Sequence, residues 1–263
     1  MTAVHDVVSF LETLAPTKMK MEWDNVGLLC GEENQPVHRI LVALDPFRNV
    51  CEEAAECGAD LLVTHHPLIF QPMHSVTDQN TVGREILFLA RHGISAVNAH
   101  TNLDQAPGGV NDCLAATLGL RNVSVICPQG TDAAGREWGL LRKGETEETD
   151  LAAFSAFVKS ALSCPGLRFV SGGKPVRFVA VGGGACAGEM LDAIDAGCDT
   201  LVTADAKYNQ FRDAYDLGLN LIDAGHFETE RPVCAYLAAR LRKEFPETEV
   251  LLSKKQFDPV HFI

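Results

Sequence analysis

The chain has 263 residues, of which 46% are hydrophobic and 22% are charged. This composition is that of an ordinary folded protein and excludes the disordered and fibrous classes. The formal net charge of −13 leaves no strong nucleic-acid signature, because binding to phosphates requires clustered Lys and Arg.

The cysteines and the apolar stretches predict the cellular compartment and whether the chain has a membrane partner. Nine cysteines occur without any Cys-x-x-Cys pair, which predicts a reduced, cytoplasmic protein. No apolar stretch approaches the roughly 18 residues of a membrane span, so we expect no membrane partner. The N-terminus lacks a basic leader, and Val4, Val7 and Leu11 have the spacing of a helix.

The first half of the chain alternates the patterns of strands and helices. Short runs rich in Val, Ile and Leu are separated by longer stretches with helical spacing. Parallel strands joined by crossover helices are the economical interpretation. The expected strands are residues 39–45, 60–64 and 94–98, and the expected helices are residues 50–57 and 82–92.

The second half repeats this order and part of the sequence. Residues 58–64 and 197–203 share Gly, Asp, Leu, Val and Thr at matching positions. Residues 93–100 also resemble residues 218–226, with one inserted residue. We therefore predict an α/β fold with two related α/β/α lobes that arose by internal duplication. Further expected elements of the second lobe are strands 177–183 and 199–203 and helix 189–196.

We predict the boundary between the lobes near residue 126. The first lobe then comprises residues 1–126 and the second residues 127–247. The last segment, residues 248–263, has one short strand pattern that could return to the first lobe. Residues 145–150 have the character of a solvated loop that ends in the N-cap of a helix at residues 151–162.

Histidines and carboxylates follow three of the apolar, strand-like runs. One run leads into a Thr-His-His-Pro sequence, and two others lead to a histidine with a carboxylate four residues later. In open α/β sheets, ligands bind beyond the carboxyl ends of the strands. These pieces therefore predict a metal site in a cleft between the lobes. The candidate ligands are His65, His66, His100, Asp104, His226 and Glu230.

Two consecutive histidines at a strand end favour two ions. Successive strand side chains point to opposite faces, so His65 and His66 can diverge toward two ions instead of chelating one. Ions about 3.5 to 4 Å apart need bridging oxygens, which Asp104 and Glu230 could supply. Imidazole and carboxylate without thiolate suit Fe, Mn, Zn or Co better than Ca. Each histidine and its carboxylate have helical spacing, although Pro107 suggests that the first pair lies in a loop that enters a helix.

Four ordered motifs resemble the signature of the Nif-three-like family, whose members are also labelled GTP cyclohydrolase 1 type 2 homologues. The motifs are residues 23–28, 64–70, 100–104 with 109–112, and 225–230. The resemblance covers nearly the whole chain. It implies a two-lobed α/β subunit with a dinuclear metal centre, assembled as a toroidal homohexamer whose sites face an internal cavity. It implies the same six ligands, with an alternative role for His100 in orienting Asp104.

Other positions near these motifs carry weaker predictions. Asp205 corresponds to His66 in the repeat and could support a ligand, meet substrate or cap a helix. Asp24 and Asn25 could meet substrate or organise a turn, and the structural role is favoured. Asn209 stands where many relatives have a histidine, which puts any acid-base role of that position in doubt.

Three glycines at residues 182–184 follow an expected strand. They predict a tight strand-to-helix turn rather than a P-loop, because no Gly-Lys-Ser or Gly-Lys-Thr follows.

Metal-dependent hydrolysis is the chemistry that such a centre favours. Two ions lower the pKa of a bridging water and stabilise the oxyanion that its attack produces. The family label points to a nucleotide substrate, GTP, with water attack on the five-membered ring of guanine and release of formate. A two-metal phosphoesterase and a non-catalytic, metal-binding hexameric scaffold or regulatory protein are the alternatives. No catalytic residue beyond the metal ligands can be assigned.

Overall fold

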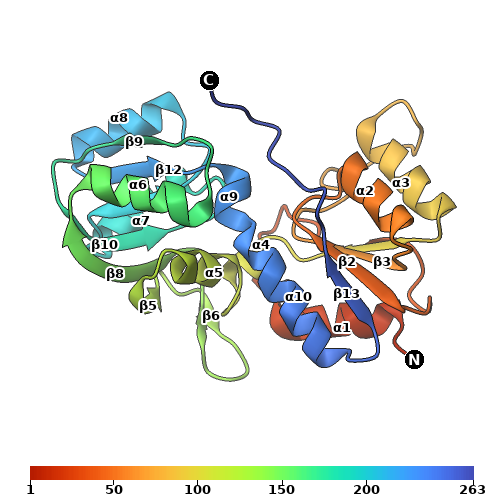
Figure 1. Ribbon diagram of the computed structural model, residues 1–263. Coiled ribbons are helices and arrows are strands. Elements are labelled where there is room, and N and C mark those ends of the chain that lie inside the picture. Colours follow the sequence, from red (N-terminus) through yellow and green to blue (C-terminus); the bar gives the residue numbers. More distant parts are fainter. The chain divides into compact units, whose positions relative to one another are not determined.

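The computed structural model describes residues 1–263 and has a mixed α/β fold (Figure 1). It divides into two compact units. The first unit is Met1–Ala106 with Val233–Phe257, and the second is Pro107–Pro232 with Asp258–Ile263. None of the helices is long and apolar enough to cross a membrane.

The first unit is built on a five-stranded sheet with the order β1-β4-β3-β2-β13. Strands β4, β3, β2 and β13 are parallel, and β1 is antiparallel to β4 at one edge. The strands are β1 (Gly27–Cys30), β2 (Arg39–Ala43), β3 (Leu61–Thr64), β4 (Ser95–Asn98) and β13 (Glu249–Leu252). The helices are α1 (Val4–Leu14), η1 (Thr17–Met19), α2 (Arg48–Glu56), α3 (Thr81–Arg91), α4 (Thr101–Gln105) and α10 (Pro232–Glu244).

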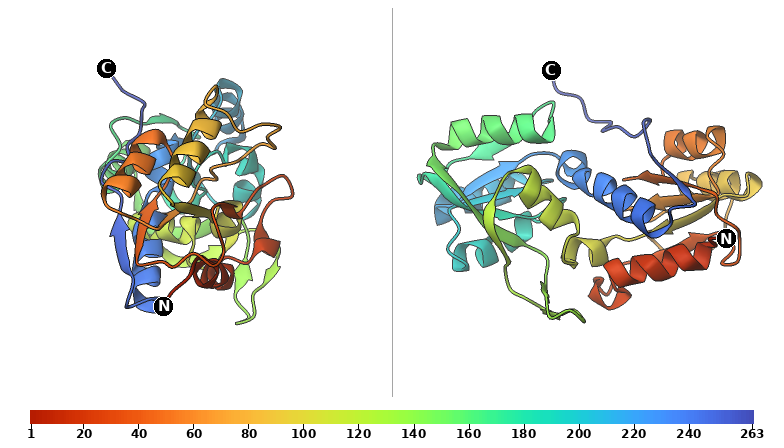
Figure 2. Two further views of the ribbon diagram at one scale, coloured as in Figure 1. Left: turned by 90° about the vertical axis from the view of Figure 1, so that its right-hand side faces the viewer. Right: turned by 60° about the horizontal axis from the view of Figure 1, so that its bottom comes forward.

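Helices cover both faces of this sheet. On one face, Val50 and Ala54 of α2 and Leu89 of α3 join a buried cluster with Leu41 and Leu62 of the sheet. Helices α1 and α10 lie on the other side of the sheet (Figures 1 and 2). Burial from both sides explains why β3 and β4 are buried along their whole length, as parallel strands usually are.

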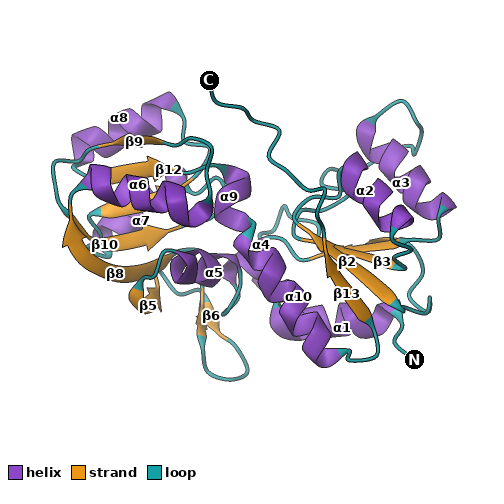
Figure 3. Cartoon of the chain, in the orientation of Figure 1, coloured by secondary structure: helices purple, strands orange, loops and turns teal.

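The second unit contains a six-stranded sheet with the order β5-β8-β10-β11-β12-β9 and a small β6-β7 hairpin (Figure 3). Its strands are β5 (Arg121–Val125), β6 (Gly130–Thr131), β7 (Glu137–Trp138), β8 (Arg142–Thr149), β9 (Arg168–Val170), β10 (Val176–Val181), β11 (Thr200–Thr203) and β12 (Asn220–Asp223). Its helices are α5 (Val110–Thr117), α6 (Leu151–Leu162), η2 (Ala187–Glu189), α7 (Met190–Asp195), α8 (Tyr208–Leu217) and α9 (His226–Glu230).

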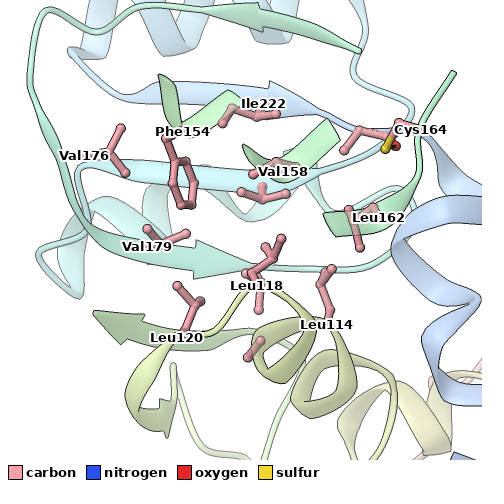
Figure 4. Close-up of a cluster of buried hydrophobic side chains, with 14 of the residues drawn as sticks. Leu114, Leu118, Leu120, Phe154, Val158, Leu162, Cys164, Val176, Val179 and Ile222 are labelled. Carbon is pink, nitrogen blue, oxygen red and sulfur yellow. Dashed lines mark hydrogen bonds between the residues drawn. The ribbon is translucent and has the colours of Figure 1, made fainter. Parts of the chain in front are cut away.

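Two apolar clusters hold helices on the two faces of the second sheet. Phe154 and Val158 of α6 pack with Leu114 of α5 against Val179 of β10 (Figure 4). A separate cluster joins α7 and α8 to the other face through residues that include Ala193. The aromatic ring of Phe154 is almost fully buried, so it contributes strongly to the stability of this layer.

The central strands of the two units share one pairing pattern. Ile40 pairs with Leu61 in the first unit, and Val179 pairs with Thr200 in the second. The next strand pairs equivalently, with Thr64 opposite Asn98 and Thr203 opposite Asp223. Each of these paired residues in the first unit corresponds in the sequence repeat to the paired residue in the second unit.

A carboxylate occupies the same place in both patterns. Asp60 accepts hydrogen bonds from the backbone N–H groups of His38 and Arg39. Asp199 accepts from the equivalent groups of Arg177 and Phe178. In each unit this bond ties the start of one strand to the start of its neighbour.

The structure differs from the sequence predictions at the sheet edges. The prediction of parallel strands is correct for β2, β3 and β4 and for β10, β11 and β12, but β1, β5, β8 and β9 add antiparallel pairs. The prediction of a loop at residues 145–150 is wrong, because β8 runs to Thr149 between β5 and β10. The N-cap prediction holds, since Asp150 accepts a hydrogen bond from the backbone N–H of Ala153.

The division into units also differs from the boundary placed near residue 126. Residues 107–126 belong to the second unit, because α5 packs into its core. Nearly all of α10 belongs to the first unit. The final strand, β13, pairs in parallel with β2, so the segment after residue 248 does return to the first sheet.

Candidate metal centre

Three imidazoles gather at the carboxyl end of the central strands of the first unit. His65 and His66 directly follow β3, and their backbone N–H groups donate to the carbonyls of Ala43, the last residue of β2, and of Leu44, which follows it. His100 follows β4 and forms the N-cap of α4. The three residues each offer one ligand atom, and these atoms lie within 4.8 Å of one another. They could therefore hold a metal ion.

Each of these rings is held through its Nδ1 atom. His65 Nδ1 donates to the carbonyl oxygen of Ala99 at 2.9 Å. His66 Nδ1 donates to Asp45 Oδ1 at 2.6 Å, and His100 Nδ1 donates to Asp24 Oδ1 at 2.8 Å. A carbonyl or carboxylate can only accept, so Nδ1 carries a proton in each ring and Nε2 is the atom that could bind a metal.

Asp104 brings a carboxylate to the same group. It lies on α4, one helical turn after His100, and its N–H bonds to the carbonyl of His100. The pair thus lies where the chain enters a helix, with His100 before its first residue and Asp104 within it. Asp104 Oδ1 is 3.5 Å from His65 Nε2. Two ligands about 2.1 Å from a common tetrahedral ion would be separated by about the same distance.

The second unit carries a smaller group of the same kind. His226 begins α9 and Glu230 ends it, so the two side chains share one helical turn. His226 Nε2 is 3.1 Å from Glu230 Oε2. His226 Nδ1 donates to Asp205 Oδ2 at 2.8 Å. Asp205 therefore fixes the ring of His226 as Asp45 fixes that of His66.

The backbone of Asp205 is adapted to this contact. Its φ of 51° lies in the left-handed region, which is uncommon for a residue with a side chain. The N-cap of α8 is Lys207, so the alternative that Asp205 caps this helix is wrong. Asn209 lies exposed in the first turn of α8.

Gly184 leaves the space that His226 and Glu230 occupy. A Cβ atom at this position would lie 2.3 Å from Glu230 Oε1 and 3.1 Å from His226 Nε2. Its φ of +65° is also the left-handed conformation that glycine adopts without strain. The expected turn at residues 182–184 is present between β10 and η2, and its last glycine borders the two candidate ligands.

The donor atoms fit a divalent transition metal. Imidazole nitrogen and carboxylate oxygen are suitable ligands for Zn, Fe, Mn or Co. Carboxylates or a carbonyl behind the histidines are the usual second layer of such sites, because they fix the ring and raise its basicity. The residues present therefore fit a metal centre.

Asp24 and Asn25 have structural roles. Asp24 is buried and accepts hydrogen bonds from His100 Nδ1 and from both the N–H and the hydroxyl of Thr101. Burial raises the pKa of the Asp24 carboxyl, but the hydrogen bonds from His100 and Thr101 outweigh it and leave the pKa well below its usual value. Asn25 donates to the carbonyl of Ile69 at 2.7 Å.

Sequence reasoning missed two contributors to these groups. Asp45 follows β2 at the same end of the sheet as the histidines, and this position after a strand was its only signal. Gly184 was assigned to a turn, but its proximity to His226 could not be inferred without coordinates. Asp45 contacts the candidate ligand His66 directly, and Gly184 leaves space beside His226 and Glu230.

Known proteins resemble the chain along its whole length. The family model for Duf34/NIF3 (NGG1p interacting factor 3) matches residues 2–259. A Clostridium perfringens protein named GTP cyclohydrolase 1 type 2 homolog is 33% identical over 263 residues, which cover 99% of each chain. A Streptomyces coelicolor protein of the same name is 37% identical over 250 residues, 92% of this chain and 86% of the relative.

The fold comparison agrees with the sequence comparisons. The crystal structure of a Bacillus cereus protein related to NIF3 superposes with a TM-score of 0.93 at 26% identity. The match covers 100% of this chain and 99% of that one.

Proposed function

Because the chain belongs to the Duf34/NIF3 family, we propose that it is a metal-dependent hydrolase with a centre of two divalent ions. One observation carries this proposal. The ligand atoms of His65, His66 and His100 lie within 4.8 Å of one another, and each ring donates from Nδ1 to a carboxylate or carbonyl behind it, as metal-binding histidines usually do. His5 and His92 also contact a backbone carbonyl through Nδ1, so the gathering of the rings, and not the tautomer alone, indicates a metal site.

We also propose that the two units are copies of one ancestral unit and that their ligands serve one centre. The shared strand pairing and the equivalent Asp60 and Asp199 bonds support the duplication. The first unit offers three imidazoles and one carboxylate, and the second offers one of each. The proposed ligands are His65, His66, His100, Asp104, His226 and Glu230.

The residues of the chain prepare the site for hydrolysis. When bound, the ions supply a water of lowered pKa and polarise the bond that is attacked. Asp45 and Asp205 keep His66 and His226 in the tautomer that ligation needs. The absence of a side chain at Gly184 keeps space for Glu230. These positions are fixed before substrate arrives, which is the condition for efficient electrostatic stabilisation.

The name of the relatives indicates the substrate to test first. They are called GTP cyclohydrolase 1 type 2 homologs. The corresponding reaction is addition of water to the five-membered ring of guanine, followed by release of formate. We take GTP as the working substrate of this chain.

The direct test is formate release from GTP by the metal-loaded protein. We expect turnover in the wild type and its loss in His65→Ala and Glu230→Ala. His92→Ala is the matched control, because His92 caps α3 and packs on Phe88 without joining the candidate ligands. A metal-loaded wild type that releases no formate but cleaves phosphomonoesters or cyclic dinucleotides would replace this substrate with a phosphoester. Absence of turnover on all of them would favour a non-catalytic scaffold.

We further propose that the subunit assembles as a cytoplasmic homohexamer, as the resemblance to the family implies. Light scattering on the purified protein should give six times the subunit mass of 28.4 kDa. A monomer or dimer at micromolar concentration would contradict this assembly.

A further inference from the structure

Two aromatic side chains of the first unit stand exposed beside the imidazole group. Trp23 is 62% exposed and Phe70 is 42% exposed. Their rings meet edge to face, with centroids 5.7 Å apart. The ring of His100 lies 6.3 Å from that of Trp23 and 6.0 Å from that of Phe70. The aromatic pair therefore borders a proposed metal ligand.

The loop that carries Trp23 is fixed by polar contacts on both sides. Asn25 donates to the carbonyl of Ile69, which joins this loop to the residue before Phe70. Asp24 accepts from His100 and Thr101, which joins the loop to the start of α4. The exposed indole is thus held in place by its neighbours in sequence rather than by burial of its own surface.

This arrangement is suited to a planar ring. In an edge-to-face pair, at least one ring keeps a face that its partner does not cover. Aromatic faces stack on heterocyclic bases with little regard to which base it is. Lys20 Nζ donates to the backbone carbonyls of Met21 and Asp24, so this cation also helps to hold the loop. A rigid aromatic surface near a few convergent polar groups is typical of small-molecule sites.

We propose that Trp23 and Phe70 form a stacking surface for a planar heteroaromatic ring of the substrate, beside the imidazole group. This assignment rests on the proposed function and specifies its substrate class. The surface binds the ring, and the neighbouring ligands carry the reaction. Asp24 and Asn25 are positioning residues. Asp24 holds His100 of the imidazole group, and Asn25 holds the residue before Phe70 of the stacking surface.

Fluorescence can test the stacking directly, because the chain has only two tryptophans, Trp23 and Trp138. The variant Trp138→Phe leaves Trp23 as the single indole. Metal-loaded Trp138→Phe should show saturable quenching by guanosine and none by ribose 5-phosphate, which lacks an aromatic ring. The reciprocal variant Trp23→Phe reports from Trp138 and corrects for absorption of light by guanosine.

Equilibrium dialysis with labelled guanosine gives the energetic contribution. Trp23→Ala should weaken binding by roughly ten-fold or more, and Trp23→Phe should retain most of the affinity because it keeps a ring. Phe70→Ala should weaken binding less than Trp23→Ala. Circular dichroism and metal content should stay unchanged in all three variants, since neither ring is a proposed ligand.

Two results would overturn the proposal. One is unchanged guanosine affinity in Trp23→Ala. The other is Trp23 fluorescence that does not change when guanosine is added but changes with protein concentration. That result would make the indole a contact between copies of the chain. Binding is measured without turnover, so the two proposals can fail separately. Quenching without hydrolysis would retain the stacking surface, and hydrolysis with unchanged kcat/KM in Trp23→Ala would retain only the hydrolase.

Discussion

Substitution of Gly184 by alanine tests whether the space beside His226 and Glu230 serves metal binding. The new Cβ would lie 2.3 Å from Glu230 Oε1, whereas an ordinary carbon–oxygen contact is about 3.3 Å. The carboxylate must therefore retreat by about 1 Å. Metal ligands tolerate deviations of only about 0.2 Å, so the displaced Glu230 should bind poorly.

The matched control is Gly173→Ala. Gly173 has a φ of +79°, similar to the +65° of Gly184, but a Cβ there would meet no atom within 4 Å. Both variants should lose about 1–2 kcal/mol through the left-handed backbone, or roughly 2–8 °C in Tm. Only Gly184→Ala carries the additional collision with Glu230.

The assay is metal affinity measured by competition with a chromogenic chelator, with Tm measured in parallel without metal. We expect Gly184→Ala to bind metal about 10–100-fold more weakly than the wild type, and Gly173→Ala to bind it normally. The Tm values of the two metal-free variants should be similar, since the end of a glutamate side chain can move at little cost. Normal metal affinity in Gly184→Ala would refute the assignment of Glu230 as a ligand.

Other consequences can be measured independently. Asp45→Ala should weaken metal binding about 10–100-fold by releasing the ring of His66, and chelator competition that shows no change would argue against a metal at His66. Glu85→Gln should stabilise the protein at pH 7 in urea denaturation, with no gain at pH 4. Burial raises the pKa of the Glu85 carboxyl, and Arg48 at 3.7 Å offsets this only in part. Stability is therefore lost as the pH rises from the unfolded-state pKa to the raised folded-state pKa, where the buried carboxyl ionises. A gain that persists at pH 4 would contradict this cause. Phe154→Ala should cost roughly 3–5 kcal/mol of unfolding free energy, because the ring is almost fully buried, while metal affinity stays normal.

The central strands and the positions of the candidate ligands in the fold were predictable because their signals are local. Apolar runs such as Leu61–Thr64 identify the strands, and the repeated segments identify their counterparts in the second unit. The ends of parallel strands meet at one edge, which explains why His65 and His100 were expected together.

The edge strands and the supporting residues were not predictable in the same way. Strand β8 contains Glu145 and other charged residues, and it is stabilised by pairing with β5 and β10 rather than by an apolar pattern. The position of α10 in the first unit depends on a chain return that local sequence does not encode. The support of His66 by Asp45 depends on the pairing of β2 with β3, and no spacing in the sequence reveals it.

The number of metal ions bound per chain tests the central claim most directly. Elemental analysis of protein purified with excess metal should give two divalent ions per chain in the wild type. If the ligands of the two units serve one centre, His65→Ala and His226→Ala should each reduce the occupancy of both ions. One ion in the wild type, or an independent loss of one ion in each variant, would contradict a shared two-ion centre.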